Sequence, residues 1–299
     1  MPDKNQNSKL DQNKTNRHWK ESNLYFTMSR LFHNKLAVTG MLIILSLIIL
    51  TLLYPVICKY SYSLVDPFNA YQTPSAEHIF GTDTLGRDIF SRIVYGVRYS
   101  LSLGFVAEML GLAIGIVFGC IAGYFGGMVD TIILRICDVI QSIPGILLCI
   151  CISQVLGSGF FSTVLALCFT GIPQVVRLLR ANILSVREQE FVEAAQAITC
   201  GNIRIMFKHI LPNCIAPLII NSSNGIGGKI MTSASLSFLG LGVQEPLPEW
   251  GAMLSAGKNY FRYYPHLVIV PGIFIAITIL AFNLIGDGLR DALDPKLRS

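Results

Sequence analysis

The stretch formed by residues 78–101 holds the spacing that comes nearest to a known chemical motif. Gly81 is followed after four residues by Gly86, Arg87 and Asp88, which is superficially the spacing of a phosphate-binding loop. Such a loop needs a lysine for the phosphates and a hydroxyl for Mg²⁺, and it follows a β-strand. Here Arg87 and Asp88 occupy those two places, and no strand pattern precedes them. We therefore predict a glycine-rich turn rather than a nucleotide site.

An amphipathic helix is predicted to follow this turn, inside a loop that runs from Cys58 to about Ser100. Its apolar residues recur at helical spacing and share one face; they are Ile89, Phe90, Ile93, Val94 and Val97. Arg92 and Arg98 remain on the other side, where they are available to a membrane interface.

Charged residues inside apolar runs are the next candidates, because a charge within a membrane is costly and usually functional. Arg135 and Asp138 lie three residues apart, so we predict a structural ion pair. Glu108 and Lys229 have no local partner. Each could pair across helices, reach an interface or line a pathway, and a structural or gating pair is favoured over direct contact with a substrate. The polar run from Asn221 to Asn224 could line a polar route or satisfy a broken helix.

Side chains for catalysis or metal binding do not converge in this sequence. The five histidines all lie outside the predicted span interiors; they are His18, His33, His78, His209 and His266. Cys149 and Cys151 are two residues apart in an apolar helix, where small packing residues are the usual interpretation. We predict no catalytic residue, no metal site and no intramembrane acid-base chemistry.

Residues 187–213 form the longest polar interval in the second half of the chain. A short helical pattern from Glu188 to Ile198 carries acids in its first turns. The chain then breaks near Gly201, and a second helical pattern follows until Pro212. A helix-break-helix between two membrane spans predicts a contact surface for a soluble partner.

Composition places these segments in an integral membrane protein. Charged residues are 14% of the 299 residues, where soluble domains carry about 25%, and the mean hydropathy is +0.56. Several apolar runs approach the ~20 residues that cross a bilayer. We predict an all-α fold with six transmembrane helices, at about Leu36–Val56, Leu101–Tyr124, Thr131–Leu156, Phe160–Leu178, Cys214–Leu236 and His266–Ile285. Residues 214–236 give the weakest of these predictions because polar residues and four glycines interrupt them.

Basic residues predict the orientation, since Lys and Arg gather on the cytosolic side. With the N-terminus in the cytosol, the inner segments carry fifteen Lys and Arg and the outer segments six. Both termini and residues 187–213 are therefore expected to be cytosolic. Residues 1–35 form a polar, basic tail, and 36–299 form the transmembrane domain.

Several blocks of this sequence resemble those of a known protein family. Glu193-Ala194-Ala195, followed by the His209–Asn213 ending, resembles the EAA loop of ABC importer permeases. Flanking blocks are similar to the second, C-type subunit of the dipeptide/oligopeptide/nickel permeases. These blocks are residues 78–100, Leu236–Gly242, Glu249–Leu254 and Asn283–Pro295.

This resemblance implies a type I ABC importer permease, multi-pass in the cytoplasmic membrane. Its implied partners are a homologous permease subunit, two ABC ATPases that bind ATP and Mg²⁺, and an extracytoplasmic binding protein; no cofactor is expected on this chain, and no nucleic acid. Trp250 and neighbouring loop residues would meet the binding protein. Residues implied to couple the chain to an ATPase are Glu193, Ala194, Ala195, Gly201, Leu211 and Pro212.

Two positions depart from the family pattern. Thr199 stands where the coupling loop usually has glycine, with Gly201 two residues later, so the helix break is expected to shift. Ser233, with Lys229 one turn earlier, stands where peptide permeases commonly have an acid. The pathway candidates are thus Glu108, Asn221, Asn224, Lys229 and Ser233. Short peptides are the expected substrates, nickel or a chelated metal is the alternative, and an ATP-independent channel would not need the EAA loop.

Overall fold

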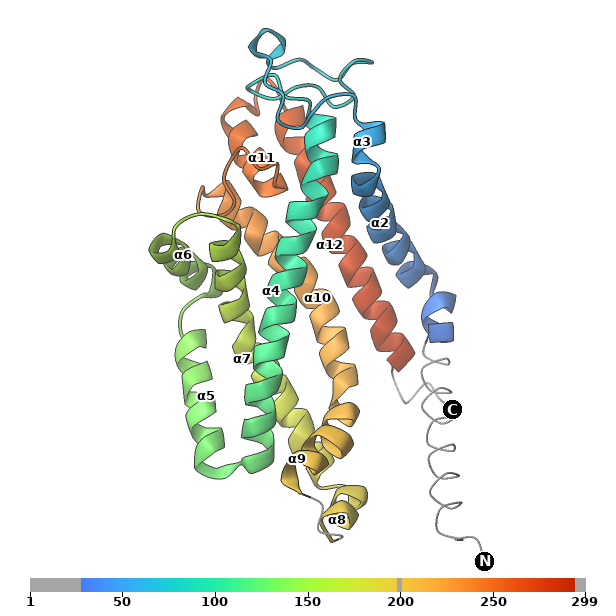
Figure 1. Cartoon of the computed structure of the whole chain (residues 1–299), viewed down its shortest axis with the longest axis vertical. Coiled ribbons are helices and arrows are strands. Elements are labelled where there is room, and N and C mark those ends of the chain that lie inside the picture. Colours follow the sequence, from blue (N-terminus) through green and yellow to red (C-terminus); the bar gives the residue numbers. More distant parts are fainter. Residues whose placement is uncertain (1–27, 198–200, 294–299) are drawn as a thin grey trace, which may run out of the picture.

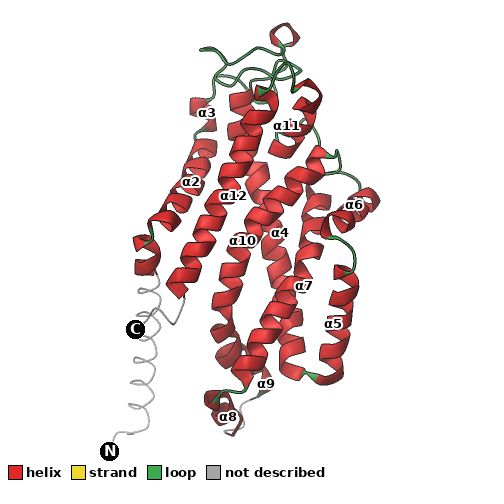
Figure 2. Ribbon diagram, turned by 180° about the vertical axis from the view of Figure 1, so that it is seen from behind, coloured by secondary structure: helices red, strands yellow, loops and turns green. Residues whose placement is uncertain are grey.

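The computed structural model describes residues 28–197 and 201–293 of the chain (Figure 1). Within them nearly all regular structure is helical (Figure 2). The α-helices are Lys35–Leu52 (α2), Tyr54–Ile57 (α3), Ile89–Phe125 (α4), Gly127–Gln141 (α5), Gly145–Leu156 (α6), Phe160–Arg187 (α7), Glu190–Ala197 (α8), Asn202–Ile205 (α9), Leu211–Phe238 (α10), Trp250–Gly257 (α11) and His266–Leu293 (α12). Shorter turns of helix lie at Pro67–Asn69 (η1), Met206–Ile210 (η2, a π-helix) and Lys258–Tyr260 (η3).

Five helices among these residues are long and apolar enough to cross a membrane, and the number is six if the bent pair α5 and α6 forms one span. The predicted all-α membrane fold is therefore confirmed. The prediction of a continuous third span is wrong, because α5 and α6 meet at 85°. The bend falls at Ser142–Pro144, where the proline lacks an N–H and disfavours helical backbone in the residue before it. Helix α10, the weakest sequence prediction, is continuous.

Helix α4 begins earlier than predicted, at Ile89. The Asp88 carboxylate caps it by accepting the backbone N–H of Ser91 at 2.7 Å. A separate amphipathic helix at the interface is therefore wrong: the apolar face of residues 89–97 is buried inside the bundle. Arg92 is also buried, at 1% exposure, instead of facing an interface.

A column of glycines on α4 explains how closely it packs against α7 (Figure 1). Gly111, Gly115, Gly119 and Gly123 recur every four residues, so they lie on one face of the helix. A Cβ built on Gly115 would lie 2.6 Å from Cβ of Val175, and similar close approaches occur at Leu179 and Ile183. Small residues at this spacing let two helix backbones approach in a membrane, where packing replaces the hydrophobic driving force.

Replacing Gly115 with Leu is expected to lower the stability of the protein by about 1–3 kcal/mol, because the new side chain overpacks the α4–α7 contact. Thermal unfolding of the purified protein in detergent measures the effect. Gly228→Ala is the matched control, because no atom lies within 4 Å of a Cβ at that mid-helix position. An equal loss of stability in both variants would contradict the packing argument.

The bundle has two distinct ends (Figures 1 and 2). One, named here the loop end, carries residues 58–88 together with α11. The other, the α8 end, carries α8 and α9. The part of the predicted tail that the structure describes is helical over residues 28–33, and Leu31 packs with Ala292 of α12; residues 1–27 lie outside the described residues.

Candidate functional site

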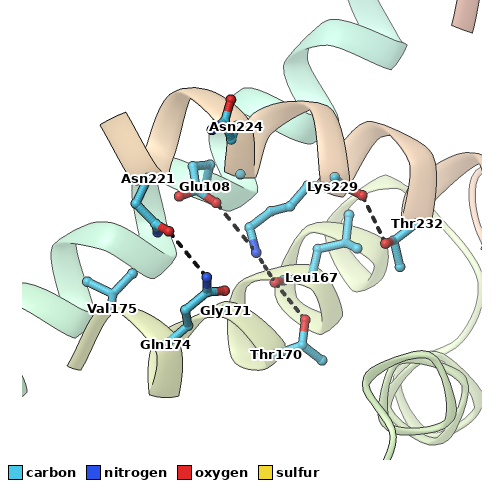
Figure 3. Close-up of a pocket in the computed structure, with 12 residues that line it drawn as sticks. Glu108, Leu167, Thr170, Gly171, Gln174, Val175, Asn221, Asn224, Lys229 and Thr232 are labelled. Atoms are coloured by element: carbon cyan, nitrogen blue, oxygen red, sulfur yellow. Dashed lines mark hydrogen bonds and ion pairs between the residues drawn. The ribbon is translucent and has the colours of Figure 1, made fainter. Parts of the chain in front are cut away.

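A polar cavity of about 390 Å³ lies between α4, α7 and α10 (Figure 3). Helix α4 contributes Glu108. The α7 wall is formed by Leu167, Thr170, Gly171, Gln174 and Val175, and the α10 wall by Asn221, Asn224, Gly225, Gly228, Lys229 and Thr232. Three membrane-spanning helices thus bring together four of the five predicted pathway residues.

Glu108 and Lys229 are the charged pair of this cavity. Oε2 of Glu108 lies 3.7 Å from Nζ of Lys229, and both side chains are largely buried. Nζ of Lys229 also donates a hydrogen bond of 2.7 Å to the carbonyl of Leu167. A buried charge is tolerated when a partner and hydrogen bonds compensate it, and Lys229 has both. The two residues that lack local partners in the sequence therefore meet across helices.

Glycines make room for this pair. A Cβ on Gly225 would lie 2.7 Å from the carboxyl carbon of Glu108, and a Cβ on Gly171 would collide with Nζ of Lys229. The glycines thus allow both charged groups to approach neighbouring backbone without a side chain in between.

The other pathway candidates differ in their surroundings. Nε2 of Gln174 donates to Oδ1 of Asn221 at 3.2 Å across the cavity (Figure 3). Asn224 lines the cavity too, but its Oδ1 is buried against Gly286 of α12 and has no hydrogen-bond partner within residues 28–197 and 201–293. Ser233 is buried one turn beyond Lys229 and does not line the cavity.

Ion pairs join α5 to α7 beside the cavity. Arg135 lies 3.6 Å from Asp138, as its spacing predicts, but Asp138 makes a closer contact with Arg177. Arg180 binds Asp130 with two nitrogens of its guanidinium group. Arg177 and Arg180 were not predicted as partners because ion pairs between α5 and α7 depend on how the two helices pack. The three-residue spacing of Arg177 and Arg180, which places both on one face of a continuing helix, is the signal that could have indicated them.

Residues 187–197 and 201–213 lie at the α8 end of the bundle (Figure 1). Within α8, Glu193 and Ala194 are exposed, whereas Val192 and Ala195 are buried in a cluster with residues of α7 and α10. Gly201 precedes α9 and accepts the N–H of Ile205. Leu211 and Pro212 form the first turn of α10, where a missing proline N–H is harmless. The predicted shift of the break at Thr199 lies outside the described residues.

The glycine-rich turn is part of a buried polar cluster at the loop end. Gly81 and Gly86 have φ of 79° and 74°, which suits glycine. Arg87 contacts Asp83 and Glu245, each at 2.6 Å. Burial alone would lower the pKa of Arg87, but the Asp83 and Glu245 carboxylates outweigh it and raise that pKa. These contacts tie the loop before α4 to the loop before α11.

Trp250 does not face outward, which corrects the expectation that it meets a binding protein. It is fully buried at the start of α11, and its Nε1 donates to the carbonyl of Ile93 at 3.2 Å. The Trp250 side chain anchors α11 to α4. Burying an aromatic ring with its N–H satisfied is a packing role, which the sequence alone does not distinguish from a surface role.

Comparison with known proteins gives the family. Residues 115–299 match the family described as "Binding-protein-dependent transport system inner membrane component", and residues 26–74 match "N-terminal TM domain of oligopeptide transport permease C". The dipeptide transport system permease protein DppC of Alkalihalophilus pseudofirmus is 46% identical over 281 residues, covering 94% of this chain and 91% of the relative. The oligopeptide permease OppC of Bacillus subtilis is 41% identical over 280 residues, covering 94% and 90%. The glutathione permease GsiD of Pectobacterium atrosepticum is 48% identical over 226 residues, covering 76% and 75%.

Solved structures agree on the fold. An inward-facing structure of the MetNI methionine ABC transporter aligns with a TM-score of 0.56 at 20% identity, covering 68% of this chain and 97% of that chain. An amino acid ABC transporter with histidines aligns with a TM-score of 0.53 at 17% identity, covering 66% and 92%.

The family matches and the helical membrane bundle together define the class. The chain belongs to the binding-protein-dependent permease family of ABC importers. Within that family it is a second, C-type membrane subunit of the dipeptide/oligopeptide/nickel branch. It is a multi-pass transport component.

Proposed function

We propose that this chain is the membrane permease subunit of an ATP-driven importer of di- and oligopeptides in the cytoplasmic membrane. It pairs with a homologous permease, and two ABC ATPases dock at its α8 end and hydrolyse ATP with Mg²⁺. An extracytoplasmic binding protein delivers substrate at the loop end. The chain itself contributes the pathway and the mechanical link, with no catalytic residue.

The proposal rests on the way in which α8 packs against α7 and α10. Val192 and Ala195 share one buried hydrophobic cluster with Leu179 and Ile183 of α7 and with Leu218 of α10. Close-packed interiors transmit displacement because they contain few voids. A push on the exposed side of α8 therefore moves the two helices that form most of the cavity wall. Glu193 and Ala194 on that exposed side are the surface offered to an ATPase.

Basic residues support the orientation. The excess of Lys and Arg in the segments predicted to lie on the cytosolic side supports a cytosolic α8 end. The same excess supports cytosolic termini and residues 58–88 on the outer side.

Peptides are the proposed substrates because the matched relatives are named as permeases for dipeptides, oligopeptides and glutathione. Uptake of a labelled tripeptide and of ⁶³Ni²⁺ by cells that carry the complete importer separates peptide transport from the nickel alternative. Accumulation of nickel but not of peptide would overturn the substrate assignment.

Glu193→Ala is expected to weaken capture of the ATPase subunits by about fivefold, because an exposed charge contributes at most about 1 kcal/mol. Scrambling residues 187–197 is expected to abolish ATP-dependent uptake while the chain still inserts into the membrane. Co-purification with the ATPases measures the first effect, and peptide uptake by intact cells measures the second. Unchanged uptake with the scrambled segment would refute the coupling role.

A further inference from the structure

We propose that the cavity between α4, α7 and α10 binds the two charged ends of a short zwitterionic peptide. Glu108 would receive the terminal ammonium group, and Lys229 the terminal carboxylate. The inference rests on the proposed import of peptides and adds to it a site and a basis for recognition.

The charges of the cavity set the first condition on a ligand. Glu108 and Lys229 are opposite charges, both largely buried, and together they are neutral. A ligand with one charge would leave a buried charge uncompensated when it separates the pair, and such charges are costly. A ligand with one charge of each sign can replace both halves of the pair at once.

The geometry of the pair leaves capacity for that ligand. The Oε2–Nζ distance of 3.7 Å is longer than a hydrogen bond. An ammonium group has three donors, and one donor of Lys229 makes a hydrogen bond of 2.7 Å to the carbonyl of Leu167. Both charged groups are therefore held near each other while retaining hydrogen-bonding capacity.

Amide groups on opposite walls suit the middle of a peptide. Gln174 of α7 and Asn221 of α10 hydrogen-bond to each other across the cavity (Figure 3). Each amide has both donors and an acceptor, so the pair can exchange its mutual hydrogen bond for bonds to a peptide group. The hydroxyl groups of Thr170 and Thr232 also line the cavity.

Glycines border part of the cavity. Gly171, Gly225 and Gly228 contribute to its walls, and the cavity volume of about 390 Å³ lies within the range of about 300–1,000 Å³ for small-molecule sites. A site that binds the charged termini and the peptide groups fits ligands that share a backbone and differ in their side chains.

Equilibrium binding to the assembled permease and ATPase complex, purified without its binding protein, tests the inference. The probes are trialanine, N-acetyl-trialanine and trialanine amide, titrated by calorimetry. The wild-type complex is expected to bind trialanine and to lose about tenfold or more in affinity on either modification, as for a lost charged hydrogen bond. Glu108→Gln should erase the penalty of acetylation alone, and Lys229→Met the penalty of amidation alone.

Two further variants make the result decisive. The double variant Glu108→Gln/Lys229→Met leaves no buried unpaired charge, so it is expected to fold and to lose both penalties. Arg135→Gln, an exposed residue away from the cavity, is expected to retain both. Absence of trialanine binding, or equal penalties in all variants, would overturn the inference. The proposed function would still stand in that case if the complete importer takes up trialanine, and it would fail separately if no peptide is taken up.

Discussion

Replacing Arg87 with Met is expected to lower the free energy of unfolding by about 3 kcal/mol, the lower end of the range for breaking a buried ion pair. Arg87 is 3% exposed, and it is the closest cationic partner of both Asp83 and Glu245. Its removal leaves the Asp83 carboxylate buried, with Arg92 3.6 Å away as the remaining cation. The effect stays at the lower end of the range because Glu245 is 40% exposed and can be solvated.

Thermal unfolding in detergent measures this effect, and Lys59→Met is the matched control. Lys59 and Glu77 form an ion pair at 3.8 Å in the same loop, but their side chains are 71% and 66% exposed. Exposed pairs contribute about 0–1 kcal/mol, so the melting temperature of this control should hardly change. Similar shifts in the two variants would show that burial of the Arg87 contacts is not what stabilises the loop end.

Ala195→Arg and Ala194→Arg are both expected to reduce uptake, but for different reasons. Ala195 is buried among residues of the α7–α10 cluster, so Ala195→Arg forces a long charged side chain into packed space and lowers stability by about 2 kcal/mol or more. Ala194 is exposed, so Ala194→Arg should leave stability unchanged within about 0.5 kcal/mol. Under the proposed function it blocks the ATPase instead.

Two measurements separate these neighbours. Ala195→Arg should lower the melting temperature of the isolated permease, whereas Ala194→Arg should keep it and lose co-purification with the ATPases. Uptake is expected to fall at least tenfold in both variants. In Ala194→Arg the reason is docking, where a loss of about 1.4 kcal/mol is already tenfold, and in Ala195→Arg it is disruption of the packing of α8 on α7 and α10. An Ala194→Arg permease that binds its ATPases and transports normally would contradict the assignment of this face.

The membrane fold could be predicted from the sequence because long apolar runs in a bilayer have few alternatives to helices. The predictions that failed concern residues whose position depends on tertiary packing. Arg92 looks like an interfacial residue in a helical pattern, yet the helix continues into the bundle and buries it. Trp250 sits in a loop-like sequence, yet its indole fills a site against α4.

The candidate site was only partly predictable for a related reason. Glu108 and Lys229 are conspicuous as lone charges in apolar sequence, but only the packing of α4 against α10 shows that they meet. Gln174 follows Pro173 within the predicted fourth span, and only the packing of α7 against α10 shows that it meets Asn221. Exposure of Ala194 and burial of Ala195 depend on how α8 lies on α7 and α10, which local spacing does not specify.

Under the proposed function, the close packing at the α4 glycines limits which helices can shift during a transport cycle. Backbones that interlock every four residues along α4 and α7 resist sliding, because a small displacement brings Val175 or Leu179 against helix backbone. Helix α5 is attached to α7 differently, through the Arg177–Asp138 and Arg180–Asp130 ion pairs. Ion pairs can exchange partners without a steric barrier. We therefore expect α4 and α7 to move together as one rigid unit, and α5, which ends at the 85° bend, to shift relative to them.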